Sequence, residues 1–119
     1  MILVDTSVWV DHFRRGDARL ADLLHAEQVA CHPFVIGELA CGNLRNRDEL
    51  LALLAALLAL PKAADQEVLN YIDQHGLAGT GLGLVDVHLL ASCQLAGGQL
   101  WTRDRRLSRA AARLGLAAA

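Results

Sequence analysis

The sequence has few aromatic residues and almost no lysine. Aromatic residues make up 4% of the chain, so its core must be built from Leu, Val and Ala. Lys62 is the only lysine among 11 basic residues, and the arginines that make up the rest suit planar recognition of phosphate or carboxylate. The formal net charge of −2 argues against a protein that coats polyanions, although it leaves room for a local basic patch.

Cysteine is also scarce, and long apolar runs are missing. Cys31, Cys41 and Cys93 are odd in number and form no CxxC pair, which argues against a disulfide framework and a zinc knuckle. We therefore expect a reducing, cytoplasmic environment. The start of the chain does not resemble a signal peptide. The longest apolar stretch, residues 50–61, is shorter than the about 20 residues that a membrane-spanning helix needs.

A length of 119 residues with 54% hydrophobic content predicts one folded domain, residues 1–119, with its own core. Short apolar runs alternate with helical patterns. Strands are expected at residues 1–4, 28–31, 61–64 and 99–102. Helices are expected at about 6–15, from 17 through at least 24, from 33 through at least 40, and at about 48–59, 65–75, 84–96 and 104–114. This alternation predicts an α/β domain with a parallel sheet.

Several helix ends carry recognisable signals. Thr6 or Ser7 is expected to cap the first helix, and Asp65 the fifth. Asn46, followed three residues later by Glu49, resembles a capping box for the Leu/Ala-rich helix at 48–59. Because that helix has Leu or Ala on every side, we expect another protein chain to cover part of it.

Acidic residues stand where two of the predicted strands end. The opening run MILV stops abruptly at Asp5, and the last strand leads into Thr102 and Asp104. Ligands of open parallel sheets lie outside the carboxyl ends of the strands. The first run therefore indicates a central strand that delivers Asp5 to a functional edge.

Two further acids, Glu38 and Asp86, lie in apolar helical stretches. Each one alone fits a surface or capping acid, but burying a lone carboxylate is costly, and all four acids together suggest one cluster. Two carboxylates about 4 Å apart repel by about 4 kcal/mol at an effective dielectric of 20, so the cluster needs protons or a divalent cation. Oxygen ligands favour Mg²⁺ or Mn²⁺ over zinc.

These motifs, in this order, resemble a PIN domain, and more narrowly the VapC ribonuclease toxins of bacterial toxin–antitoxin pairs. The blocks that carry the resemblance are LVDTSVWVD, GEL, GLVDVHLLA and LWTRDRRL, and they span essentially the whole chain. The resemblance implies a three-layer fold, a short central parallel sheet flanked by helices. It also implies an Mg²⁺- or Mn²⁺-dependent endoribonuclease, a cognate antitoxin and a homodimer. The alanine tail at 117–119 leaves the family's final edge strand absent or very short.

By motif, the metal-binding and catalytic acids of the family fall on Asp5, Glu38, Asp86 and Asp104, with Thr6, Ser7 and Thr102 in support. The chemistry agrees independently, because a carboxylate-held metal activates water and stabilises phosphoryl charge without a protein nucleophile. The candidate RNA contacts are Arg103, Arg105, Arg14 and Arg15. Arg109 and Arg113 are better explained by a solvated helix face.

Other side chains have structural explanations. His88 lies two residues after Asp86, about 200° around the helix, so a structural or interface role is favoured. Asp11 fits a surface acid better than a supporting site residue. Trp9 and Trp101 fit the core or an interface better than a platform for stacked bases.

Rival functions fail on particular residues. A haloacid-dehalogenase-type phosphatase needs a second Asp where Ser7 stands, and a receiver domain needs a lysine after a late strand, whereas Lys62 is the only one. A dinucleotide site needs a glycine-rich turn where DTSVWV stands. The alternative left open is a catalytically inactive PIN-like module that binds RNA or protein.

Overall fold

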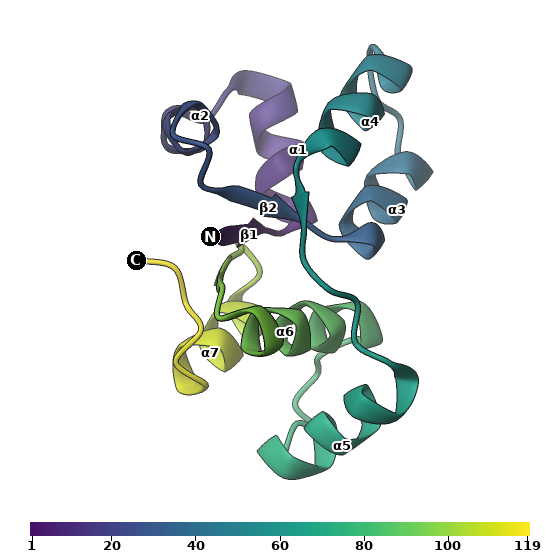
Figure 1. The fold of residues 1–119 in the computed structure, drawn as a ribbon, viewed down its shortest axis with the longest axis vertical. Coiled ribbons are helices and arrows are strands. Elements are labelled where there is room, and N and C mark those ends of the chain that lie inside the picture. Colours follow the sequence, from purple (N-terminus) through teal and green to yellow (C-terminus); the bar gives the residue numbers. More distant parts are fainter.

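The computed structural model describes residues 1–119 and consists of four short strands and seven helices (Figure 1). In chain order they are β1 (Ile2–Val4), α1 (Thr6–Arg15), α2 (Ala18–His25), β2 (Val29–Cys31), α3 (Pro33–Cys41), α4 (Arg47–Ala56), β3 (Leu58–Ala59), α5 (Asp65–His75), α6 (Leu84–Ala96), β4 (Gln99–Trp101) and α7 (Arg105–Arg113). The predicted α/β class is confirmed. None of the helices has the length and apolarity needed to cross a membrane.

The strands form one parallel sheet in the order β3-β2-β1-β4. β1 is central, as its unbroken apolar sequence predicts, with Leu3 and Val4 fully buried. Beyond β4, Leu100 and Ala117 form a single parallel bridge, with 2.7 Å from the Leu100 N–H to the Leu116 carbonyl. The expected final edge strand is therefore present but very short.

The strand order explains the three layers. Connections between parallel strands are right-handed, so the links that lead from β1 to β3 lie on one face and those that lead to β4 on the other. Figure 1 shows α1 to α4 on one side of the sheet and α5 to α7 on the opposite side. β2 and β3 are added on one side of β1 and β4 on the other, so the strand order reverses between β1 and β4. Open α/β sheets bind ligands at such a switch point.

The core is aliphatic, as predicted, and α6 runs through it. Seven consecutive residues of α6, from Val87 to Cys93, are buried. His88 is among them, 3% exposed, with its ring 6.4 Å from that of His32. Burial lowers the pKa of His32 to about 4 and also lowers the pKa of His88. The favoured structural role for His88 agrees with this packing.

The expectation for the third strand was wrong. The Leu/Ala run does not remain helical to residue 59, because α4 ends at Ala56 and Leu58–Ala59 form β3, not residues 61–64. The backbone of β3 pairs with β2, and the Leu60 N–H donates to the Cys31 carbonyl at 2.9 Å. Leu and Ala favour helix intrinsically, but strand pairing overrides that preference here.

Three capping predictions were also wrong in detail. Asp5, not Thr6 or Ser7, caps α1. Asn46 precedes α4 in a left-handed conformation and makes no side-chain capping bond. Ala64, not Asp65, is the N-cap of α5, where the Glu67 carboxylate accepts from the Ala64 N–H at 2.9 Å. At α1, neighbouring polar residues compete for the cap, and the direction in which the chain enters the helix decides among them.

Candidate active site

Asp5 lies at the centre of the functional edge, directly after β1. Its backbone N–H donates to the Trp101 carbonyl at 2.9 Å, which aligns the end of β1 with the end of β4. The residue is only 7% exposed. One oxygen, Oδ2, accepts from the Ser7 hydroxyl at 2.7 Å and from the Thr102 hydroxyl at 2.8 Å. These two hydrogen bonds hold the buried carboxylate in one orientation, although no cation from the protein balances its charge.

The loop after β4 is tied to the start of α1 by these hydroxyls. The Ser7 hydroxyl accepts from the Arg103 backbone N–H at 3.0 Å, and the Thr102 hydroxyl accepts from the Asp104 N–H at 3.1 Å. The predicted supporting residues Ser7 and Thr102 therefore orient Asp5 and brace the segment that carries Asp104.

Asp86 faces the same region from the first turn of α6. Its Oδ2 accepts from the Gly83 N–H at 3.1 Å. Partial burial raises the pKa of Asp86, the Gly83 hydrogen bond opposes that rise, and the negative charges of Asp5 and Asp104 add to it. Mutual repulsion of this kind requires the three carboxylates to lie within electrostatic reach of one another.

Glu38 approaches from α3 on the other face of the sheet. It is exposed, and its Oε1 accepts from the Thr6 hydroxyl at 2.7 Å. Thr6, the residue after Asp5, therefore links Glu38 to the start of α1. The third predicted supporting residue thus has a defined contact.

The four acids share one bonding pattern. In each, a single oxygen accepts hydrogen bonds from the protein: Asp5 Oδ2, Glu38 Oε1, Asp86 Oδ2 and Asp104 Oδ1. The second oxygen of each has no hydrogen-bond or ion-pair partner in the protein. Oriented carboxylates with one free oxygen suit a hard divalent cation that also binds water and phosphate.

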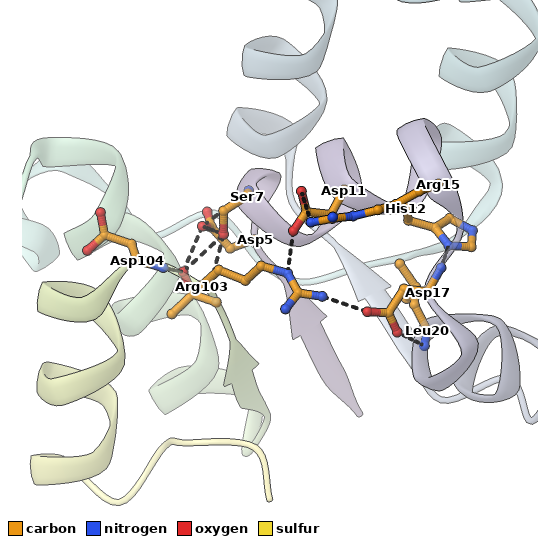
Figure 2. Close-up of polar contacts among 10 residues, drawn as sticks. Asp5, Ser7, Asp11, His12, Arg15, Asp17, Leu20, Arg103 and Asp104 are labelled. Atoms are coloured by element: carbon orange, nitrogen blue, oxygen red, sulfur yellow. Dashed lines mark hydrogen bonds and ion pairs between the residues drawn. The ribbon is translucent and has the colours of Figure 1, made fainter.

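The acids are not closed around a single point. No three of them approach closely enough to form a ready-made metal-ligand set. Asp104 is exposed, and its Oδ1 accepts a hydrogen bond from the Leu107 N–H. Figure 2 shows its carboxylate projecting away from that of Asp5. The residue types and their free oxygens fit a hard cation such as Mg²⁺ or Mn²⁺.

Three helix N-termini converge at this edge of the sheet. Asp5 and Asp104 are the N-caps of α1 and α7, and Asp86 occupies the first turn of α6. Helix N-termini carry partial positive charge and unpaired N–H groups, which stabilise ionised carboxylates and bound phosphates. The fold therefore supplies some of the positive potential that the acidic cluster lacks.

A second group of acids lies beside the site and is neutralised internally. Arg103 donates to Asp11 at 2.8 Å and to Asp17 at 2.6 Å, bridging α1 and the N-cap of α2 (Figure 2). The Leu20 N–H lowers the pKa of Asp17, and the Arg103 charge lowers it further. Asp11 is thus more than the surface acid that the sequence suggested. Nothing in the local sequence of Asp11 or Asp17 signals this long-range pairing.

The other candidate RNA contacts differ in their surroundings. Arg105 is exposed at the start of α7, and Arg15 is 76% exposed and lies 3.6 Å from Asp11. Arg14 lines a cleft of about 600 Å³ that also borders Thr6 and Glu38. This cleft runs between α1, α3 and α4, with Phe13, Leu39, Leu44 and Leu50 on its apolar walls.

Comparison with known proteins assigns the family. The model of the PIN domain family matches residues 2–113. The chain belongs to the PIN-domain family. Two curated relatives of this PIN domain, both named Ribonuclease VapC32 and coming from two strains of Mycobacterium tuberculosis, are 52% identical to it over 120 residues. Each match covers 100% of this chain and 97% of the relative, which confirms the VapC group.

A solved structure supports the fold of this PIN domain. The crystal structure of PAE2754 from Pyrobaculum aerophilum superposes with a TM-score of 0.62, covering 92% of this chain and 83% of that one. Sequence identity is 19%, so the similarity concerns the fold alone.

Proposed function

We propose that this PIN domain is a VapC-type toxin endoribonuclease that uses Mg²⁺ or Mn²⁺ and is inhibited by a cognate antitoxin. The observation that carries the proposal is the bonding of the acids: Asp5, Glu38, Asp86 and Asp104 each keep one unpartnered oxygen near the switch point of the sheet. The identity of 52% to proteins named Ribonuclease VapC32 supports RNA as the substrate.

In the proposed mechanism, the acids hold the metal and the helix ends assist. PIN-domain VapC ribonucleases are generally metal-dependent, and a bound divalent cation supplies an activated water and neutralises charge that develops on the phosphate. Asp5 and Asp86 are the two acids with restricted exposure, so we assign them the central ligand positions. Ser7 and Thr102 keep Asp5 oriented, and the N-termini of α1, α6 and α7 favour binding of the phosphate.

We propose two protein partners. The cleft of about 600 Å³ borders both Glu38 and Leu50, so a segment of antitoxin lying in it would reach the acids. A second copy of this chain is the proposed cover for the remaining apolar surface, because Leu53 is 49% and Leu58 is 55% exposed, whereas Leu54 is fully buried.

The decisive test is an RNA cleavage assay with purified protein. We expect cleavage with Mg²⁺ or Mn²⁺, none with excess chelator, and a loss of about 10²–10⁴-fold in Asp5→Asn, since metal-based charge stabilisation contributes several kcal/mol. The variant is purified identically, which controls for contaminating ribonuclease. Cleavage that persists in chelator would refute the mechanism. RNA binding without cleavage at any metal concentration would favour the inactive binding module instead.

A further inference from the structure

The arginines of this protein fall into two sets, those that meet a carboxylate and those that do not. Arg103 contacts Asp11 and Asp17, and Arg15 lies near Asp11. Arg106 and Arg109, by contrast, make no hydrogen bond or ion pair with the protein, and Arg113 donates only to the His75 carbonyl, at 3.1 Å. Unpaired cations gathered in one place are a mark of anion binding.

Three of the arginines that meet no carboxylate line one small cavity. Spacings of three and four residues place Arg106, Arg109 and Arg113 on one face of α7. Opposite them lies the loop that leads into α6. The cavity has a volume of about 210 Å³ and is lined by Thr80, Leu82, Arg106, Arg109, Ala110 and Arg113. No carboxylate lines it, although acidic residues outnumber basic ones, 13 to 11, in the chain.

The side chain of Arg106 lies against the loop that borders this cavity. Gly81 has a φ of +82°, and a Cβ at that position would lie 2.9 Å from Nη1 of Arg106. The side chain of Arg106 therefore lies directly against the loop, in space that only glycine leaves open.

Two segments of the chain connect this cavity with the acidic site. Arg106 follows Asp104 by two residues, and the loop at 80–83 leads directly to the first turn of α6, which carries Asp86. The cavity has no aromatic side chain on which a base could stack. Its chemistry therefore suits a phosphate and not a nucleobase.

We infer that this cavity binds a phosphate of the RNA backbone outside the bond that is cut, with Arg106 and Arg109 as its main contacts. The inference rests on the proposed ribonuclease function and deepens it. It also differs from the expectation from sequence, which placed Arg109 and Arg113 on a solvated helix face. The candidate RNA contacts named there were Arg103, Arg105, Arg14 and Arg15. Contacts of this kind bind substrate and transition state alike, so they act on KM and not on kcat.

The test measures RNA affinity and its salt dependence in the full chain. A fluorescent single-stranded RNA is titrated with Asp5→Asn protein, which is expected to cleave it about 10²–10⁴-fold more slowly than wild type, and with the same protein carrying Arg106→Gln and Arg109→Gln. We expect the affinity to fall by about tenfold or more and the slope of log affinity against log salt to become shallower by about 0.7 for each arginine removed. In otherwise wild-type protein, the double variant should raise KM and leave kcat unchanged.

Two further variants control for charge and fold. Arg47→Ala removes an exposed arginine outside the cavity and should change neither affinity nor slope by a comparable amount. Arg106→Lys should keep the salt slope while weakening affinity, because it retains the charge and loses the planar guanidinium. Equal affinity and slope in the double variant, alongside active wild-type enzyme, would overturn the inference. Wild-type protein that neither binds nor cleaves RNA would instead refute the proposed function.

Discussion

Two groups of acids lie side by side in this PIN domain, and they are treated in opposite ways. Asp11 and Asp17 share the guanidinium of Arg103, so the protein supplies their countercharge. The acids of the candidate site receive hydrogen bonds on one oxygen only and no cation from the protein. The difference supports the proposal that the first group maintains the fold and the second holds an external cation.

Replacing one aspartate by asparagine in each group should give the largest difference between the two groups. Asp86→Asn is expected to lower RNA cleavage by about 10²–10⁴-fold, because it removes a charged ligand from the proposed metal site. Asp17→Asn should leave cleavage within a few-fold of wild type, since asparagine can still cap α2 through the Leu20 N–H. Initial cleavage rates at saturating Mg²⁺ measure both. Comparable losses in the two variants would erase the distinction.

Metal binding should stabilise the fold through the acids of the candidate site and not through Asp11 and Asp17. At a Mg²⁺ concentration 100 times its Kd, binding to the folded state adds about 2.7 kcal/mol to the free energy of unfolding. We expect thermal melts to show this rise in wild type and in Asp17→Asn, and a much smaller one in Asp86→Asn. A rise of the same size in Asp86→Asn would mean that Mg²⁺ binds elsewhere.

A buried histidine outside the acidic site should make stability depend on pH. The pKa of His32 is about 4 when folded against an ordinary 6.5, so between these values the unfolded chain binds the extra proton. The free energy of unfolding should therefore fall as the pH drops from about 6.5 towards 4, by up to about 3 kcal/mol. His32→Asn keeps an acceptor for the Phe34 N–H and should flatten this fall. Chemical denaturation across that pH range measures it, and an unchanged slope would count against His32.

The hydrogen bonds that orient Asp5 offer a smaller perturbation. Thr102→Val removes the hydroxyl that donates to Asp5 Oδ2 at 2.8 Å and keeps a similar shape. Loss of such a supporting contact commonly costs about 10–100-fold in metal affinity or activity. Mg²⁺ titration of cleavage should show the higher requirement for metal. If Thr102→Val instead needs no more Mg²⁺ for cleavage than wild type does, the Ser7 hydroxyl alone is enough to position Asp5.

Breaking the neutralised group should have the smallest effect. Arg103→Ala leaves Asp11 and Asp17 without their shared cation, but Arg103 is 43% exposed, so we expect a loss of only about 1 kcal/mol in stability. Chemical denaturation measures that loss. Arg103→Lys should recover part of that stability because lysine keeps the positive charge. Recovery should be incomplete, since lysine cannot contact both carboxylates in the same planar way. A loss in Arg103→Ala as large as that from removing a core residue would give this ion pair a much greater structural role.

Much of the fold was predictable because local signals agreed with tertiary structure. α6 occupies Leu84–Ala96 as predicted, since a glycine-rich loop precedes it and Gly97 ends it in a left-handed conformation. β3 was not predictable from its own sequence, because a Leu/Ala run favours helix and only pairing with β2 makes residues 58 and 59 a strand. The cap of α1 was missed because Asp5 was already assigned to the functional site. One carboxylate can both cap a helix and belong to that site.

The sequence by itself determined the α/β class, the family and the four candidate site acids, because strand ends, capping residues and acids in apolar stretches are local patterns. Tertiary structure alone decided which charges meet. Arg103 pairs with acids 86 and 92 positions away in sequence, whereas Arg106 and Arg109 remain unpaired beside the loop at 80–82. Electrostatic pairing depends on distances of a few ångströms across the fold, and the spacing of residues along the chain does not encode such distances.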